Sequence, residues 1–123
     1  MNLSEFSKLN LKRCTSPDAF NHQLDSWSPA EWTNAMLGEG GEAANLTKKL
    51  LRHRDNVAGN HKAEDKDVES LRRRARAEIA DAIIYADLAI QTLGGDTSYE
   101  VAKAFNLKSE ELGCEIFVDM EDD

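Results

Sequence analysis

The sequence predicts an all-α protein, and its composition and residue pattern support that prediction. Only two prolines and seven glycines interrupt the 123 residues, and no segment shows the sustained apolar/polar alternation of a half-buried strand. Apolar residues make up 41% of the chain, which is enough for the one core that a chain of this length usually has. We therefore expect an antiparallel helical bundle of two long helices plus shorter flanking helices. Residues 1–113 would form a single domain, and residues 114–123 an acidic C-terminal tail.

Capping signals predict where the first two helices begin. Ser16-Pro17-Asp18 combines a cap, a first-turn proline and a first-turn acid, and predicts a short helix to about Leu24. Ser28-Pro29-Ala30-Glu31 repeats the signal more strongly, with proline at the first helical position and glutamate three residues after the serine. Apolar residues at mostly helical spacing then continue to about Arg54, which predicts a long helix.

The second half of the chain predicts a loop and two more helices. Residues 55–67 are polar and contain Gly59-Asn60, so we expect a loop there. A long helix should run from about residue 68 to 93 and end at Gly94-Gly95. A capping box, Thr97-Ser98-Tyr99-Glu100, should open a helix that closes at Gly113. The last apolar segment, 114–120, is predicted to be a short strand or an extended tail that packs on the bundle.

Charge and hydropathy narrow the class of protein. Seven of the eight units of net negative charge lie in residues 109–123, and no basic footprint for duplex nucleic acid is present. No run reaches the ~18 apolar residues of a membrane span, and residues 1–12 lack the apolar stretch of a secretory signal. We expect a cytoplasmic protein that binds no membrane, with Cys14 and Cys114 as reduced thiols.

Two carboxylates interrupt the most apolar helix. Residues 78–90 are apolar nearly all round, as in a buried helix, yet Glu78 and Asp81 lie three apart on one face, and Tyr85 continues that face. A buried carboxylate without a partner is costly, so a compensating group is expected.

The preceding long helix carries a matching pair, Glu39 and Glu42, also three residues apart. In an antiparallel hairpin with a rise of ~1.5 Å per residue, all four acids fall at nearly the same height. Four acids in one groove would repel one another, and oxygen-only ligands favour Mg²⁺ or Mn²⁺ over zinc. Either pair alone could equally lie on a solvated helix face, and it is the match in height that favours a metal site.

Three motifs in order resemble a known family. They are the run from Trp32 through Leu37-Gly38-Glu39-Gly40-Gly41-Glu42-Ala43-Ala44, then Glu78-Ile79-Ala80-Asp81, then Lys103-Ala104-Phe105-Asn106-Leu107-Lys108. Together, over roughly residues 27–113, they resemble the MazG-like, all-α nucleoside triphosphate pyrophosphohydrolases. That family has an ExxE pair, an ExxD pair on the next helix, and a later K…N…K element.

The resemblance implies a function. It implies that Mg²⁺, with Mn²⁺ able to substitute, binds through Glu39, Glu42, Glu78 and Asp81, and that a (d)NTP is split into a (d)NMP and pyrophosphate. It also implies a homodimer or homotetramer that controls or cleanses the nucleotide pool, in the cytoplasm or, for a phage-encoded member, in the host cytoplasm. Glu39 or Glu42 could accept the proton of the attacking water, and the sequence does not choose between them.

Further residues are candidates for binding substrate. Lys103 and Lys108 could hold the charge of pyrophosphate, and Asn106 could hydrogen-bond phosphate or sugar oxygens. Trp27 could stack on a base, and Tyr85 could touch substrate, although both could equally fill a core or an interface. A basic cluster near the hairpin tip could attract phosphates or a neighbouring subunit, although a solvated helix end is the commoner explanation; its members are Arg72, Arg73, Arg74, Arg76, Lys48, Lys49, Arg52 and Arg54.

Two other classes of helical protein could carry such acids. A ferritin-like di-iron bundle needs Glu-x-x-His pairs, and no glutamate here is followed by histidine at the third position. A non-catalytic helical oligomerisation module remains open, and its acids would be solvated and substitutable.

Overall fold

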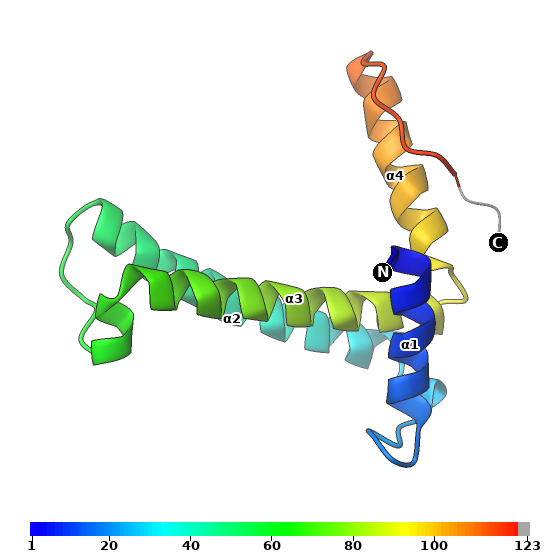
Figure 1. The fold of residues 1–123 in the computed structure, drawn as a ribbon, viewed down its shortest axis with the longest axis horizontal. Coiled ribbons are helices and arrows are strands. Elements are labelled where there is room, and N and C mark those ends of the chain that lie inside the picture. The colour runs from blue at the N-terminus through cyan, green and yellow to red at the C-terminus, as the bar shows by residue number, and fades with distance from the viewer. Residues whose placement is uncertain (121–123) are drawn as a thin grey trace. The chain divides into compact units, whose positions relative to one another are not determined.

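The computed structural model describes residues 1–120, and every regular element in that range is helical (Figure 1). The α-helices are α1 (Leu3–Thr15), α2 (Pro29–Arg54), α3 (Val68–Thr92) and α4 (Thr97–Leu112), with single 3₁₀ turns η1 (Leu24–Ser26) and η2 (Ala63–Lys66). The prediction of an all-α fold is therefore confirmed. No helix within residues 1–120 is long and apolar enough to cross a membrane. The last three acids of the predicted tail lie outside the described residues.

The chain divides into two compact units. One comprises Ala30–Ala86, and the other combines Met1–Pro29 with the chain from Asp87 onward. The prediction of a single domain stays a prediction, and each unit is described by itself below.

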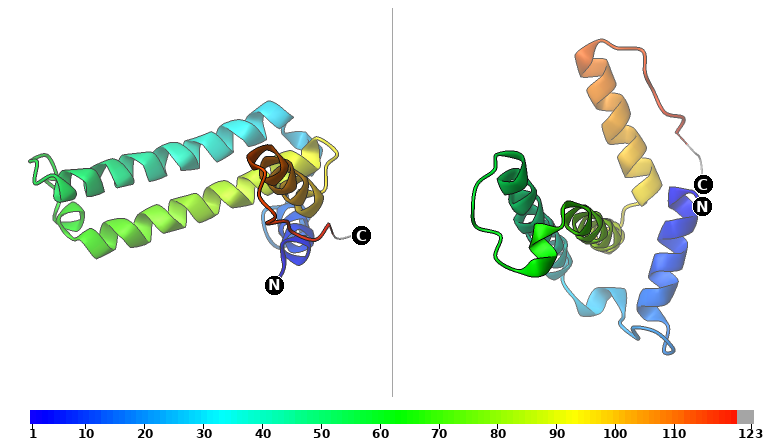
Figure 2. Two further views of the ribbon diagram at one scale, coloured as in Figure 1. Left: turned by 90° about the horizontal axis from the view of Figure 1, so that it is seen from above. Right: turned by 60° about the vertical axis from the view of Figure 1, so that its left-hand side comes forward.

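The first unit is a hairpin in which α2 and α3 run antiparallel (Figure 2, left). Both long helices lie where the capping signals predict them. At the start of α3, the Asp67 carboxylate accepts a hydrogen bond from the Glu69 N–H at 3.0 Å and satisfies a free backbone donor. The loop-side half of the hairpin holds a small core of Leu46, Leu71 and Ala75, with Leu50 packed against it.

This core covers little of the apolar surface of the two helices. Ile79 and Ile83 are 49% and 54% exposed, and Leu37 is 62% exposed. The expectation that the apolar run on α3 is buried is therefore wrong for Ile79 and Ile83, whereas Leu88 and Ala89 at the end of the run are buried. Two helices can cover only the faces that they turn toward each other, and the remaining faces of α3 stay open.

The second unit begins with a helix that the capping signals above did not predict. Asn2 caps α1 in a reciprocal capping box, accepting from the Glu5 N–H at 2.8 Å while the Glu5 side chain accepts from the Asn2 N–H. The predicted short helix from Ser16 to Leu24 is wrong, because this segment forms turns and only η1 is helical. Ser16 is extended, as residues before proline tend to be, and Asn21 has a φ of 49° that no helix continues.

A buried aspartate holds this unit together. Asp87, at the C-terminal part of α3, is 1% exposed and accepts four side-chain hydrogen bonds at 2.5–3.0 Å. Two donors come from α1, one from α3 itself and one from the start of α4; they are Ser7, Asn10, Gln91 and Thr97. Neutral donors thus satisfy the charge, and the same carboxylate ties three helices together.

The last helix is capped one residue earlier than predicted. Asp96, rather than Thr97, is the N-cap of α4, and its carboxylate accepts from the Tyr99 N–H at 2.9 Å. Gly113 ends the helix as predicted, with a left-handed φ of 69° that glycine adopts without strain. After it the chain is extended rather than a strand, and Asn106 on α4 pairs with both backbone polar groups of Val118 at 2.9 Å.

Candidate metal centre

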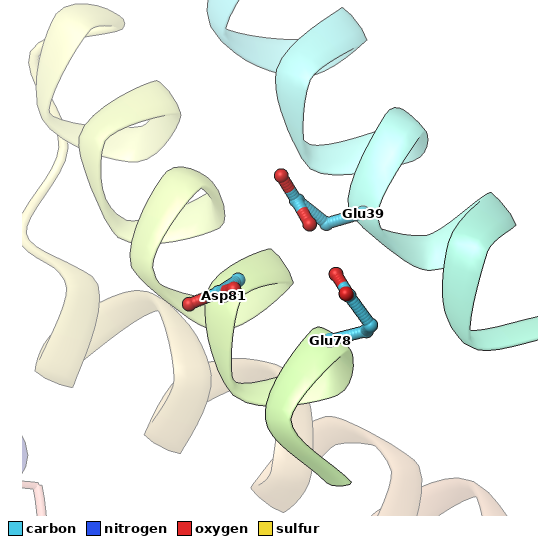
Figure 3. Close-up of side chains that lie close together, drawn as sticks. All are labelled: Glu39, Glu78 and Asp81. Atoms are coloured by element: carbon cyan, nitrogen blue, oxygen red, sulfur yellow. The ribbon is translucent and has the colours of Figure 1, made fainter. Parts of the chain in front are cut away.

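Three carboxylates from the two helices of the hairpin converge. Glu39 on α2 and Glu78 and Asp81 on α3 each present an oxygen atom, and these atoms lie within 4.8 Å of one another (Figure 3). Glu39 and Glu78 are half-buried, and Asp81 is exposed. The spacing explains the convergence, since residues three apart share a helix face and the antiparallel helices bring the two pairs to one height.

Glu42 belongs to the same electrostatic cluster, although its side chain is exposed. Hydrogen bonding to Glu78 and the negative charge of Glu78 raise the pKa of Glu42 above its ordinary value. The pKa of Glu78 is raised in turn, first by its hydrogen bond with Glu39 and also by the charges of Glu39 and Asp81. The neighbouring carboxylates therefore disfavour the ionisation of Glu42 and Glu78, as like charges in one groove do.

The donor set fits a hard divalent cation. All four side chains offer oxygen only, the ligand type that Mg²⁺ and Mn²⁺ prefer. Two oxygens on one Mg²⁺ lie at most about 4.2 Å apart, given a ligand distance of about 2.1 Å. The observed oxygen atoms lie within 4.8 Å of one another, so a small movement of the side chains would let all three bind one ion.

An open groove of about 530 Å³ adjoins the acids. Glu42 and Glu78 line it, together with Gly38, Gly41, Asn45, Leu46, Arg74 and Ala77. A Cβ atom built on Gly40 or Gly41 would meet no atom within 4 Å. No other segment of the described chain packs closely against these glycines. The space beside them is therefore open to a ligand or to another copy of the chain.

The two aromatic candidates lie in different units. Tyr85 is half-buried on α3, one turn after Asp81, with its ring centroid 6.3 Å from that of the buried Trp32. Trp27 is half-buried beside His22, in an edge-on contact with ring centroids 4.9 Å apart. Both rings already pack against an aromatic neighbour.

The substrate-binding candidates of the third motif, Lys103, Asn106 and Lys108, lie on α4, in the unit that does not contain the four acids. Their contacts there are local. The Lys103 ammonium lies 5.9 Å from the Tyr99 ring centroid, and that of Lys108 lies 3.0 Å from the Glu111 carboxylate. The Asn106 amide is engaged with the backbone of Val118, so it would have to release that segment to bind a substrate.

Two residues near the acids were not assigned individually from the sequence. Arg74 lines the groove with Glu42 and Glu78, and Asp65 holds the Arg74 side chain at 2.9 Å. Arg74 precedes Glu78 by four residues, a spacing that places both on one helix face, so the sequence did contain a signal for it. Asp65 lies in the polar loop, and nothing in its local sequence marks it.

Comparison of the chain with protein-family models, curated proteins and solved structures found no match.

Proposed function

We propose that the protein is a Mg²⁺-dependent nucleotide pyrophosphohydrolase of the MazG-like type, which cleaves a (d)NTP to a (d)NMP and pyrophosphate. The observation that carries the proposal is the convergence of Glu39, Glu78 and Asp81 from two facing helices, with Glu42 coupled to them. The order of the ExxE, ExxD and K…N…K motifs supports the family assignment. Manganese is expected to replace magnesium.

The four acids would hold the metal ion, and one of them would also act as the general base. Glu39, Glu42, Glu78 and Asp81 would hold the cation, which supplies positive charge for the triphosphate and lowers the pKa of a nearby water. Glu39 or Glu42 would accept the proton that the water loses as its oxygen bonds to phosphorus in the α–β anhydride. The P–O bond between that phosphorus and the bridging oxygen breaks. Pyrophosphate leaves with the bonding electrons if the α-phosphorus is attacked, and the nucleoside monophosphate leaves with them if the β-phosphorus is attacked.

The exposed apolar faces of the hairpin support a homo-oligomer, a dimer or a tetramer. Leu37 on α2 and Ile79 and Ile83 on α3 are each about half or more exposed. A second hairpin laid against them would bury this surface and stabilise the assembly. The same surface also favours the alternative, a non-catalytic helical oligomerisation module.

One assay separates the two functions. The protein is incubated with each of the common NTPs and dNTPs and Mg²⁺, and monophosphate and pyrophosphate are quantified, with EDTA as control. An enzyme releases the two products in equal amounts, loses activity in EDTA and recovers it with Mg²⁺ or Mn²⁺. Absence of turnover with all the nucleotides would favour the module.

A further inference from the structure

Arg74 lines the groove together with Glu42 and Glu78, and the residues on the loop side of the groove hold its guanidinium in a fixed orientation. One Nη atom of its guanidinium donates to the Asp65 carboxylate at 2.9 Å and to the Glu64 carbonyl at 3.0 Å, and Nε donates to the Ser70 hydroxyl at 3.2 Å. The side chain is 28% exposed. Among residues 1–120, the other Nη atom donates no hydrogen bond, so Arg74 keeps donors for a further acceptor.

Asp65 is the fixed point of this arrangement. Its side chain is 3% exposed and also accepts from the Lys49 ammonium at 2.8 Å. The hydrogen bonds from Lys49 and Arg74 lower the pKa of Asp65, which keeps it ionised. The backbone carbonyl of Asp65 lies 2.7 Å from His53 Nε2, so the loop is anchored on both helices of the hairpin. The single negative charge of Asp65 faces the two positive charges of Lys49 and Arg74, so this group of side chains has an excess of positive charge.

The groove therefore combines two kinds of recognition. Glu42 and Glu78 can hold a cation, and Arg74, one helical turn nearer to the loop, can bind an anion directly. A magnesium-loaded polyphosphate presents both partners, the cation and free phosphate oxygens. Guanidinium groups match phosphate oxygens in charge and geometry better than an ammonium does.

We propose that Arg74 binds the terminal phosphates of the substrate, the part that leaves as pyrophosphate, and that Asp65 in the connecting loop is its positioning residue. This inference rests on the proposed function. It gives the loop over residues 55–67 a role, because Glu64 and Asp65 hold the guanidinium of Arg74, a residue that lines the groove. It also orients the substrate, with its triphosphate end toward the loop.

Binding of pyrophosphate tests the assignment without turnover. Calorimetric titrations compare the wild type, Arg74→Ala and Arg73→Ala, first with Mg²⁺ alone and then with pyrophosphate in excess Mg²⁺. Arg73 belongs to the same basic cluster and is an exposed neighbour on the same helix, but it does not line the groove. Its substitution therefore makes the same charge change outside the groove and reports any general attraction of phosphate by the cluster. Arg74→Ala should bind Mg²⁺ like the wild type and pyrophosphate at least about tenfold more weakly, since one charge-assisted contact is lost. Arg73→Ala should match the wild type in both titrations.

The outcomes separate this inference from the proposed function. A wild type that binds no Mg²⁺ refutes the proposed function and the inference with it. A wild type that binds Mg²⁺ refutes the inference alone if it binds no pyrophosphate, or if Arg74→Ala binds pyrophosphate with unchanged affinity. Should Arg74→Ala fail to fold, Arg74→Lys decides, because lysine keeps a cation for Asp65 but lacks the fork; unchanged affinity in that variant would equally refute the inference.

A double-mutant cycle tests the role of Asp65. Asp65→Asn should weaken binding of pyrophosphate but not of Mg²⁺, and in combination with Arg74→Ala it should add little further loss. A positioning residue has no effect once the residue that it positions is gone. Fully additive losses would show that Asp65 does not act through Arg74.

Discussion

If the four acids share one site, a divalent cation should stabilise the fold, and removing one acid should have two opposite effects. The perturbation is Glu78→Gln, because Glu78 lies beside Glu39 and Asp81 and its charge also raises the pKa of Glu42. In EDTA, the variant should be as stable as the wild type or more stable, since one charge leaves a crowded cluster. In Mg²⁺ it should lose most of the stabilisation that the wild type gains.

The magnitude follows from linkage. A cation that binds only the folded state stabilises it by ~2.7 kcal/mol at a hundredfold excess over its dissociation constant. For 123 residues, with an unfolding entropy of about 2.1 cal/mol/K per residue, this corresponds to a rise in Tm of about 10 °C. Carboxylates that already lie within 4.8 Å of one another need little rearrangement to bind, so most of this gain should be observed.

The same prediction can also be tested through the pH dependence of the stability of the fold. Glu42 and Glu78 have pKa values raised above the ordinary 4.5 in the folded protein. Their contribution to stability is therefore fully present below pH 4.5 and is lost as the pH rises through the folded-state values. In EDTA, the stability of the wild type relative to Glu78→Gln should fall over that range. The Mg²⁺-induced shift should grow there, because the cation binds the ionised carboxylates.

Differential scanning fluorimetry in EDTA, in NaCl of matched ionic strength and in MgCl₂ measures these shifts. Glu110→Gln is the matched control, because Glu110 is an exposed glutamate on α4, in the unit without the acids. It should show the full wild-type shift. Equal Mg²⁺ shifts in the wild type and in Glu78→Gln would refute the shared site, and a shift no larger than that in NaCl would refute specific cation binding.

Three further predictions follow from the site, the apolar faces and the buried aspartate. Glu42→Gln and Asp81→Asn should each lower turnover by about 10²-fold or more, because each removes a ligand charge; steady-state rates near wild type in both would overturn the site assignment. Light scattering should give a mass of two or four times 13.7 kDa, and a mass of 13.7 kDa would contradict the oligomer. Asp87→Ala should lower the free energy of unfolding by about 3 kcal/mol, because it leaves buried donors unpaired; urea denaturation measures this, and a change below 1 kcal/mol would mean that water replaces the carboxylate.

Capping chemistry and glycine made most of the fold predictable. Pro29 and Gly113 lie at the predicted helix ends, because a proline at the first turn and a left-handed glycine after the last act locally. The errors were also local in origin. The Asn2–Glu5 capping box begins α1 ahead of the first signal on which the prediction rests, and Ser16 takes the extended conformation of a residue before proline instead of capping a helix.

The convergence of the acids could be predicted because it depends only on spacing within two helices. The role of Asp87 cannot be assigned from the sequence, since two of its four donors, Ser7 and Asn10, lie nearly 80 residues away. An acid in an apolar run signals that a partner exists, but not which one. The role of Asp65 cannot be assigned either, because it lies in a polar loop and only the fold brings Lys49 and Arg74 to it from two different helices.

The network around Asp65 also braces the hairpin on the loop side of the acids. Asp65 binds Lys49 on α2 and Arg74 on α3, and so links the two helices at those positions. Glu42 lies seven residues before Lys49 and Asp81 seven residues after Arg74, a distance of about 10.5 Å along each helix. A slip of one residue on either helix would separate the two pairs of acids by about 1.5 Å and also turn one pair by about 100° away from the groove. The loop thus helps to hold the register on which the proposed metal site depends, besides holding the guanidinium of Arg74.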